Sequence, residues 1–174
     1  WKNGQAPFGY GDGDEETELD YGKDKENKPI TAYFRKVFTV ENPSDFEQLS
    51  LGVLHDDGVM VYLNGSMIAR NNMPRTTIKP DSLAPNSRGS DAENKFWPSK
   101  FSGERLRQGL NVIAVEVHQN RPDSSDLGFD LEISAEAINT EEVIADVESG
   151  RATRRLEGWA DRLPAGWMEL LKRL

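Results

Sequence analysis

The stretch HDDGVMVYLNG, residues 55–65, gives the clearest indication of how this chain folds. From Val59 to Leu63 every second residue is a branched apolar one, and this period of two is typical of a β-strand. Asp57-Gly58 precedes the strand and Asn64-Gly65 follows it, and both dipeptides favour tight turns. We therefore predict a short strand that is entered and left through tight turns.

Similar patterns predict further strands on both sides of this stretch. The predicted strands are 32–40, 46–55, 59–63, 67–70, 96–101, 111–119 and 127–134. Residues 1–31 are rich in Gly, Asp and Pro, so we expect an ordered loop there with little regular structure. Residues 71–95 are a long polar connection, and such a connection inside a compact domain is usually functional or mobile.

The chain changes character after the last predicted strand. Asn139 is a suitable N-cap for a helix, because acidic residues follow it in the first turn. Apolar residues then recur at helical spacing between positions 156 and 174. We therefore predict a β-domain over residues 1–137 and a helical extension or linker over residues 138–174. The extension either packs against the β-domain or docks onto a partner.

The composition excludes several classes of function. The net charge is −9 and the pI is about 4.8, which is the wrong sign for binding a nucleic-acid backbone or an anionic membrane surface. The chain has no cysteine, which excludes disulfides, zinc–cysteine sites and thiol catalysis. No apolar run approaches the ~18 residues that a membrane-spanning helix needs, so we expect no membrane insertion. Trp1 is not a natural start, so we expect a processed form or part of a longer protein.

Six phrases follow one another in an order that is typical of one family. They are GQAPFGYGDGDE (4–15), TAYFRKVFTV (31–40), LHDDGVMVYLNG (54–65), ARNNMP (69–74), GLNVIAVEVHQ (109–119) and SSDLGFDLEI (124–133). In this order they resemble the galactose-binding-domain-like jelly-roll modules of large secreted bacterial proteins. Such modules stand beside metallophosphatase, lamin-tail or spore-coat-kinase-like domains, and they are similar to the sugar-binding domains of many glycosidases. The resemblance covers residues 1–135.

This resemblance implies an all-β fold, a jelly-roll or galactose-binding-like β-sandwich, to which the C-terminal helical extension is added. It also implies an extracellular or cell-surface location. Family members have a further aromatic-rich strand before the segment that matches Trp1, and that strand is missing here. We therefore expect an open sheet edge, which is a template for strand addition from another chain.

A calcium site is expected in the acidic loop 11–20. Asp12, Asp14 and Glu15 are the candidate ligands, because calcium prefers carboxylate oxygens and glycine-punctuated acidic loops can wrap it. The resemblance supports this expectation, since galactose-binding-like folds often hold a structural calcium near the chain start. The alternative is a solvated acidic loop that keeps the protein soluble.

A ligand site is expected where the strand 111–119 ends. His118, Gln119 and Asp126 could supply polar groups for a sugar, and Trp97 or Tyr62 could supply an aromatic plate. The alternative is that His118 only caps the strand end and that the loop residues only fix a turn.

Two further candidate sites have weaker support. The pair Asp56-Asp57 is expected to bond its own backbone in a turn, and a metal or ligand role is the alternative. His55 and His118 both end strands, but nothing in their spacing enforces the geometry of a zinc site.

The sequence does not support an enzyme. Ser124 and Ser125 follow no Gly-x-Ser-x-Gly elbow, and Asp130 and Glu132 lie on an outward strand face where nothing would raise a pKa for acid catalysis. We therefore predict a non-catalytic, ancillary binding module for carbohydrate, with calcium as a structural cofactor. The alternative is a structural subunit of an extracellular assembly, in which the open edge and the C-terminal helices make contacts between chains.

Overall fold

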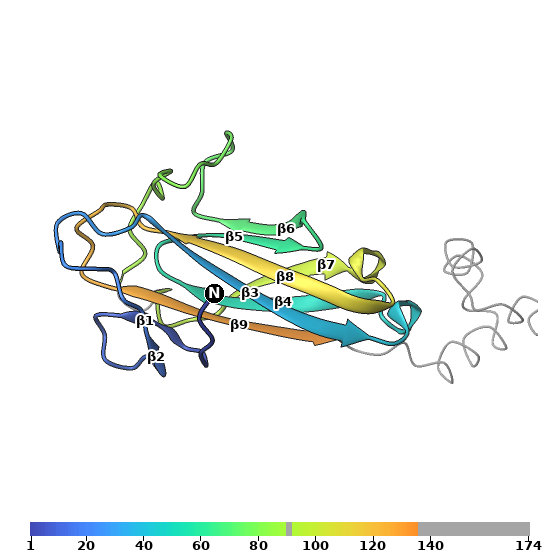
Figure 1. The fold of residues 1–174 in the computed structure, drawn as a ribbon. Helices are drawn as coiled ribbons and strands as arrows, with labels where there is room; N and C mark the ends of the chain where they lie inside the picture. The colour runs from blue at the N-terminus through green and yellow to red at the C-terminus, as the bar shows by residue number, and fades with distance from the viewer. Residues whose placement is uncertain (90–91, 136–174) are drawn as a thin grey trace, which may run out of the picture.

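The computed structural model describes residues 1–89 and 92–135, and these form two β-sheets that share one core (Figure 1). Sheet A has five strands, and in spatial order they are β2 (Thr17–Glu18), β1 (Phe8–Tyr10), β9 (Leu127–Ala135), β4 (Gln48–His55) and β7 (Trp97–Ser102). Sheet B has four, in the order β3 (Thr31–Val40), β8 (Gly109–His118), β5 (Gly58–Leu63) and β6 (Ser66–Asn71). Two short 3₁₀ helices, η1 (Pro43–Asp45) and η3 (Gly103–Arg105), complete the regular structure of these residues. The prediction of an all-β sandwich is confirmed.

The core lies between the two sheets because alternate residues of each central strand face inward. In β4 the buried positions include Leu49, Leu51 and Val53, and in β5 they include Val59 and Val61. Each fully buried side chain of this size contributes roughly 1.5–3 kcal/mol relative to an exposed one. The alternation that predicted these strands is therefore also the pattern that stabilises the fold.

The hairpin at Asn64-Gly65 is joined to the start of β8. Asn64 and Gly65 both have positive φ values, 52° and 83°, as a tight hairpin turn requires. The Asn64 side chain donates to Oδ1 of Asn111 at 2.8 Å and accepts from the backbone N–H of Val112 at 3.0 Å. A hydrogen bond between Asn64 and Asn111 therefore joins the hairpin turn to β8.

The N-terminal segment has more regular structure than the sequence predicts. β1 pairs with β9, so that Phe8 lies opposite Phe129, and β2 pairs with β1. The Phe8 ring also packs against Phe34 of β3, with 5.3 Å between the ring centroids. Strands of three and two residues are too short to show a period, and aromatic packing across the two sheets holds them in place.

Residues 72–96, called the strap below, run from β6 to β7 around one end of the sandwich (residues 90 and 91 are not described). Three hydrogen bonds fix the strap to the loops of that end. The Thr31 hydroxyl donates to the carbonyl of Pro80 at 2.6 Å, and the N–H of Ala84 donates to the carbonyl of Gln119 at 3.0 Å. The N–H of Arg88 donates to Asp57 at 2.6 Å.

β3 is an edge strand of sheet B, since β8 is its one partner within the described residues. In this part of the chain no helix is long and apolar enough to span a membrane. The predicted helical extension over residues 138–174 lies outside the described residues.

Candidate functional site

Three carboxylates from separate segments converge at the end of the sandwich where the strap lies. Asp56 lies in the turn between β4 and β5, Glu93 lies in the strap, and Asp126 lies just before β9. One oxygen of each lies within 4.8 Å of the others. Asp56 is only 6 % exposed, whereas Glu93 and Asp126 are half-buried. This group is called the loop-end cluster below.

The electrostatics of the cluster disfavour three negative charges. Burial raises the pKa of Asp56 to about 9, and a contact with Asp57 and the charges of Asp126 and Glu93 add to the effect. Burial followed by the charge of Asp126 raises the pKa of the nearby Tyr10 hydroxyl to about 12. Asp56 therefore keeps its proton at neutral pH unless a cation offsets the repulsion.

Asp57 holds this end of the sandwich together. Its Oδ1 accepts from the N–H of Arg88 at 2.6 Å, and its Oδ2 accepts from the N–H of Asn120 at 2.8 Å. The expectation that Asp56-Asp57 bonds its own turn backbone is therefore wrong for the Asp57 carboxylate. Its oxygens bind two other segments because the strap and the β8–β9 loop both run past the turn. Each of them presents a backbone N–H group to the carboxylate.

Gln119 adds an unpaired oxygen beside the loop-end cluster. Its side-chain N–H group donates to the carbonyl of Asp126 at 2.7 Å and lies 3.5 Å from the Tyr10 hydroxyl. The residue is 1 % exposed, and its Oε1 has no hydrogen-bond partner within the described residues. An unpaired buried oxygen costs free energy, and an amide oxygen is a ligand that calcium accepts.

His55 and Trp97 lie together on sheet A. The His55 ring meets Trp97 edge-on, with 6.3 Å between centroids and an interplanar angle of 85°. Nδ1 of His55 donates to the carbonyl of Asp57 at 3.1 Å, and burial lowers the pKa of His55 to about 4. Trp97 is half-buried and packs against the core.

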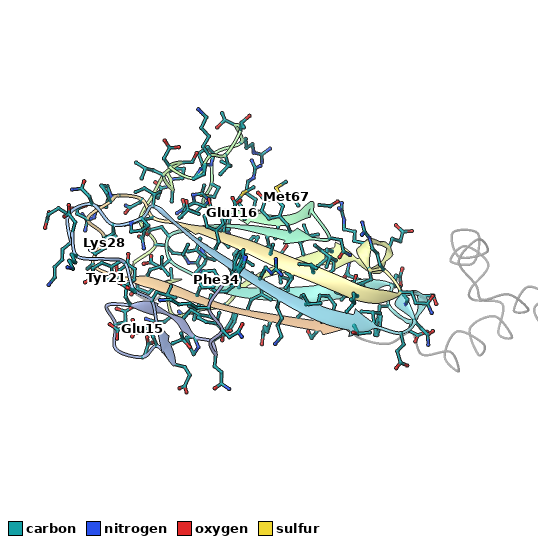
Figure 2. The ribbon with its side chains drawn as sticks, viewed as in Figure 1. Glu15, Tyr21, Lys28, Phe34, Met67 and Glu116 are labelled. Carbon is teal, nitrogen blue, oxygen red and sulfur yellow. The ribbon has the colours of Figure 1, made fainter. Side chains whose placement is uncertain are left out.

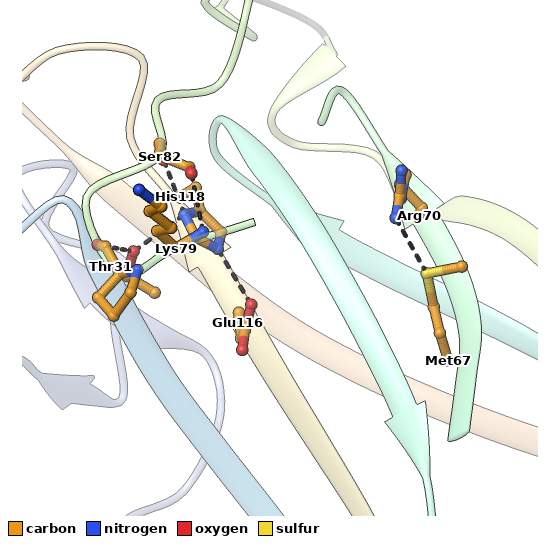
Figure 3. A network of polar contacts seen from close by, with 8 residues as sticks. Thr31, Met67, Arg70, Lys79, Ser82, Glu116 and His118 are labelled. Atoms are coloured by element: carbon orange, nitrogen blue, oxygen red, sulfur yellow. Dashed lines mark hydrogen bonds and ion pairs between the residues drawn. The ribbon is translucent and has the colours of Figure 1, made fainter. Parts of the chain in front are cut away.

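His118 and Tyr62 lie on the outer side of sheet B, and Figure 3 shows Glu116 beside His118 on this face. His118 is fully buried beneath the strap, and its Nε2 lies 3.3 Å from a Glu116 oxygen. Burial, followed by the charge of Glu116, raises the pKa of the Tyr62 hydroxyl. Two of the predicted ligand residues, Gln119 and Asp126, therefore lie at the loop end, whereas His118 and Tyr62 lie on the outer face of sheet B.

The predicted calcium loop uses its carboxylate internally. Glu15 accepts from the N–H groups of Asp12 and Gly13 at 3.1 and 2.9 Å. Among the residues that the structure describes, the carboxylates that meet in a group of three are those of the loop-end cluster, not Asp12, Asp14 and Glu15. Calcium in this loop stays a prediction, and the loop-end cluster is the better-formed alternative.

Sequence reasoning does not identify Glu93 and gives a metal or ligand role to Asp56 only as the alternative to a turn. The sequence does contain a feature that points to Asp56, because two adjacent aspartates before a glycine exceed what one turn needs. The same dipeptide also favours a turn, which is the interpretation given above. Glu93 has no such feature, because it is one of many polar residues in the strap. His55 and His118 were considered as a metal pair, and neither belongs to the cluster.

Neither a protein-family model nor a curated protein sequence matches this chain. Glycosidases are among the solved structures that match over part of it. The α-L-rhamnosidase of Streptomyces avermitilis, complexed with L-rhamnose, is 17 % identical with a TM-score of 0.42, and the match covers 67 % of this chain and 10 % of that one. The α-L-rhamnosidase of Aspergillus terreus is 13 % identical with a TM-score of 0.46, and the match covers 67 % of this chain and 13 % of that one.

A β-glucosidase of Kluyveromyces marxianus is 18 % identical with a TM-score of 0.43, and the match covers 72 % of this chain and 13 % of that one. This chain therefore spans about a tenth of the length of the glycosidases it matches.

Proposed function

We propose that this chain is a non-catalytic binding module of an extracellular protein, and that it binds carbohydrate through a calcium ion at the loop-end cluster. We also infer that the module is of the galactose-binding-domain-like kind. The observation that supports a cation is the convergence of Asp56, Glu93 and Asp126 from three segments far apart in the chain.

The chemistry of the cluster favours a hard divalent cation. Its donors are carboxylate oxygens, and the unpaired Oε1 of Gln119 lies in the same region. Calcium takes six to eight oxygen ligands in a flexible geometry, whereas magnesium demands a stricter octahedron. A bound cation would also remove the repulsion that keeps Asp56 protonated, so the apparent affinity should rise with pH.

A carbohydrate would complete the coordination of such an ion. Three carboxylates leave positions that water fills, and a pair of neighbouring sugar hydroxyls can replace two waters at similar geometry. Glu93 and Asp126 are half-buried, so the cluster is accessible from solvent on their side. This arrangement binds a ligand and needs no reacting group.

The experiment is calorimetric titration of the whole chain with calcium chloride, together with glycan-array binding in calcium and in a chelator. Asp126→Asn and Glu93→Gln should lose calcium binding, and glycan binding should disappear with it. Asp123→Asn is the matched control, because it removes a carboxylate from the same loop that is exposed and paired with Arg121. A chain that takes up no calcium, or that binds glycans equally well in chelator, would contradict the proposal.

A further inference from the structure

A second cluster of aromatic and charged side chains lies on the outer face of sheet B, on three adjacent strands. Tyr33 of β3 stands directly opposite Glu116 of β8. Tyr62 of β5 pairs with Ala114, the neighbouring outward position on β8. Figure 2 shows Glu116 on this side of the sandwich. Two tyrosines therefore flank one carboxylate.

The strand register brings both tyrosines to the same side of the sheet as that carboxylate. Burial followed by the charge of Glu116 raises the pKa of both Tyr33 and Tyr62. Arg70 opposes this effect at Tyr62 and itself donates to the carbonyl of Pro74 at 2.8 Å. The cluster thus contains a negative and a positive group close to the same aromatic ring.

Buried His118 fixes the position of Glu116 (Figure 3). Nδ1 of His118 lies 2.9 Å from the carbonyl oxygen of Ser82, and Nε2 lies 3.3 Å from a Glu116 oxygen. Nδ1 also lies 2.9 Å from the Thr31 hydroxyl. The strap thus holds the Nδ1 side of the ring through Ser82, and the Nε2 side faces Glu116. Glu116 is therefore preorganised on an exposed face.

The composition of this face selects one kind of occupant. An anionic ligand would be repelled by the carboxylate of Glu116, and an apolar partner would bury that carboxylate without giving it a new charge partner, which is unfavourable. A neutral polyhydroxylated ligand fits both features, because its hydroxyls can donate to Glu116 while its C–H faces lie on tyrosine rings. Tyr33 is 46 % exposed, so its ring is available for such a contact.

We propose that the outer face of sheet B binds a neutral polysaccharide, whose pyranose rings stack on Tyr33 and Tyr62 and whose hydroxyls donate to Glu116, with His118 as the residue that positions Glu116. The site deepens the proposed carbohydrate-binding function by adding a subsite. It differs from the loop-end cluster in needing no cation.

The test is affinity electrophoresis of the whole chain in EDTA, in gels that contain laminarin, xyloglucan, galactomannan or arabinoxylan. At least one of these neutral polysaccharides should retard the wild-type chain. Tyr33→Ala, Tyr62→Ala and Glu116→Gln should each weaken binding about tenfold or more, as expected for the loss of a principal contact. Tyr62→Phe keeps the ring and should retain most of the affinity, which separates a lost contact from a misfolded variant.

Leu110→Ala is the matched control, since Leu110 is 70 % exposed at the opposite end of the same strand. Its affinity should stay within about twofold of wild type. No retardation by any of the four polysaccharides, or full binding by both tyrosine variants, would overturn the proposal. A wild-type dimer in sedimentation velocity that Tyr62→Ala converts to a monomer would overturn it too, because a second copy would then occupy the face.

Asp126→Asn separates this inference from the proposed function. If the variant loses calcium-dependent glycan binding but keeps polysaccharide binding in EDTA, both sites are supported. If calcium has no effect on the wild type while the tyrosine variants lose polysaccharide, the loop-end proposal fails and the sheet-face proposal stands.

Discussion

The backbone N–H of Asn120 donates to Oδ2 of Asp57 at 2.8 Å, and this bond ties the loop after β8 to the turn between β4 and β5. The other oxygen of Asp57 accepts from the N–H of Arg88, so one carboxylate organises all three segments of the loop end. We expect Asp57→Ala to lower the free energy of unfolding by about 3 kcal/mol, because it removes two charge-assisted hydrogen bonds at a buried position. Urea denaturation measures this loss.

Asp123→Ala provides the comparison for that measurement, since Asp123 is an exposed aspartate in the β8–β9 loop. Its effect should stay within about 0.5 kcal/mol. Equal losses for the two variants would show that Asp57 has no special role in joining the loops.

Calcium uptake should release close to one proton per ion at pH 7. In the cation-free protein the pKa of Asp56 is about 9, so its carboxyl is protonated, and a bound cation would ionise it. Titrations in buffers of different ionisation enthalpy measure the protons released. Asp56→Asn removes one of the three carboxylates, so it should show neither calcium uptake nor proton release. A wild-type enthalpy that is independent of the buffer would rule out a protonated Asp56 in the site.

His55 should make the fold sensitive to acid. Its pKa is about 4 when folded, compared with 6.5 as its ordinary value, so between these pH values the unfolded chain binds more protons than the folded one. The free energy of unfolding therefore falls as the pH falls through this window, by up to about 3 kcal/mol from this group. In His55→Gln this contribution should be missing from stability curves measured between pH 7 and pH 4. Curves of equal slope for the two proteins would contradict it.

Gly103 should not tolerate a side chain. A Cβ there would lie 1.8 Å from the carbonyl oxygen of Phe46, so the backbone would have to move. We expect Gly103→Ala to destabilise the protein by about 3 kcal/mol in thermal or urea unfolding. Gly128 is the control, because a Cβ there would have an ordinary contact of 3.5 Å with Leu54. If Gly128→Ala were as harmful as Gly103→Ala, the close approach to Phe46 would not be the cause.

The fold could be predicted from the sequence wherever burial alternates along a strand. β4 and β8 show this pattern over at least five residues, and the structure confirms both strands. β1 and β2 could not be predicted, because their places depend on packing of Phe8 against residues from β3 and β9. Such contacts join distant parts of the chain and leave no local pattern.

The candidate site could be predicted only in part, for a similar reason. Asp126 and Gln119 were identified from their place after a central strand. Glu93 approaches them because the strap is fixed by the bonds of Arg88 to Asp57 and of Ala84 to Gln119. No spacing in the sequence encodes those bonds. The role proposed for Glu116 depends on Tyr33 and Tyr62, which come from two other strands.

The exposed edge of β3 has a built-in protection against aggregation. Lys36 stands opposite the buried Ile113, on the inward-facing side of the strand and between Phe34 and Phe38, yet it remains exposed. Another strand that hydrogen-bonded to this edge would enclose the Lys36 ammonium group among apolar side chains. An inward-facing charge of this kind is a known guard of natural sheet edges. The ten-residue edge strand can therefore remain unpaired with the edge of a second molecule, even at high protein concentration.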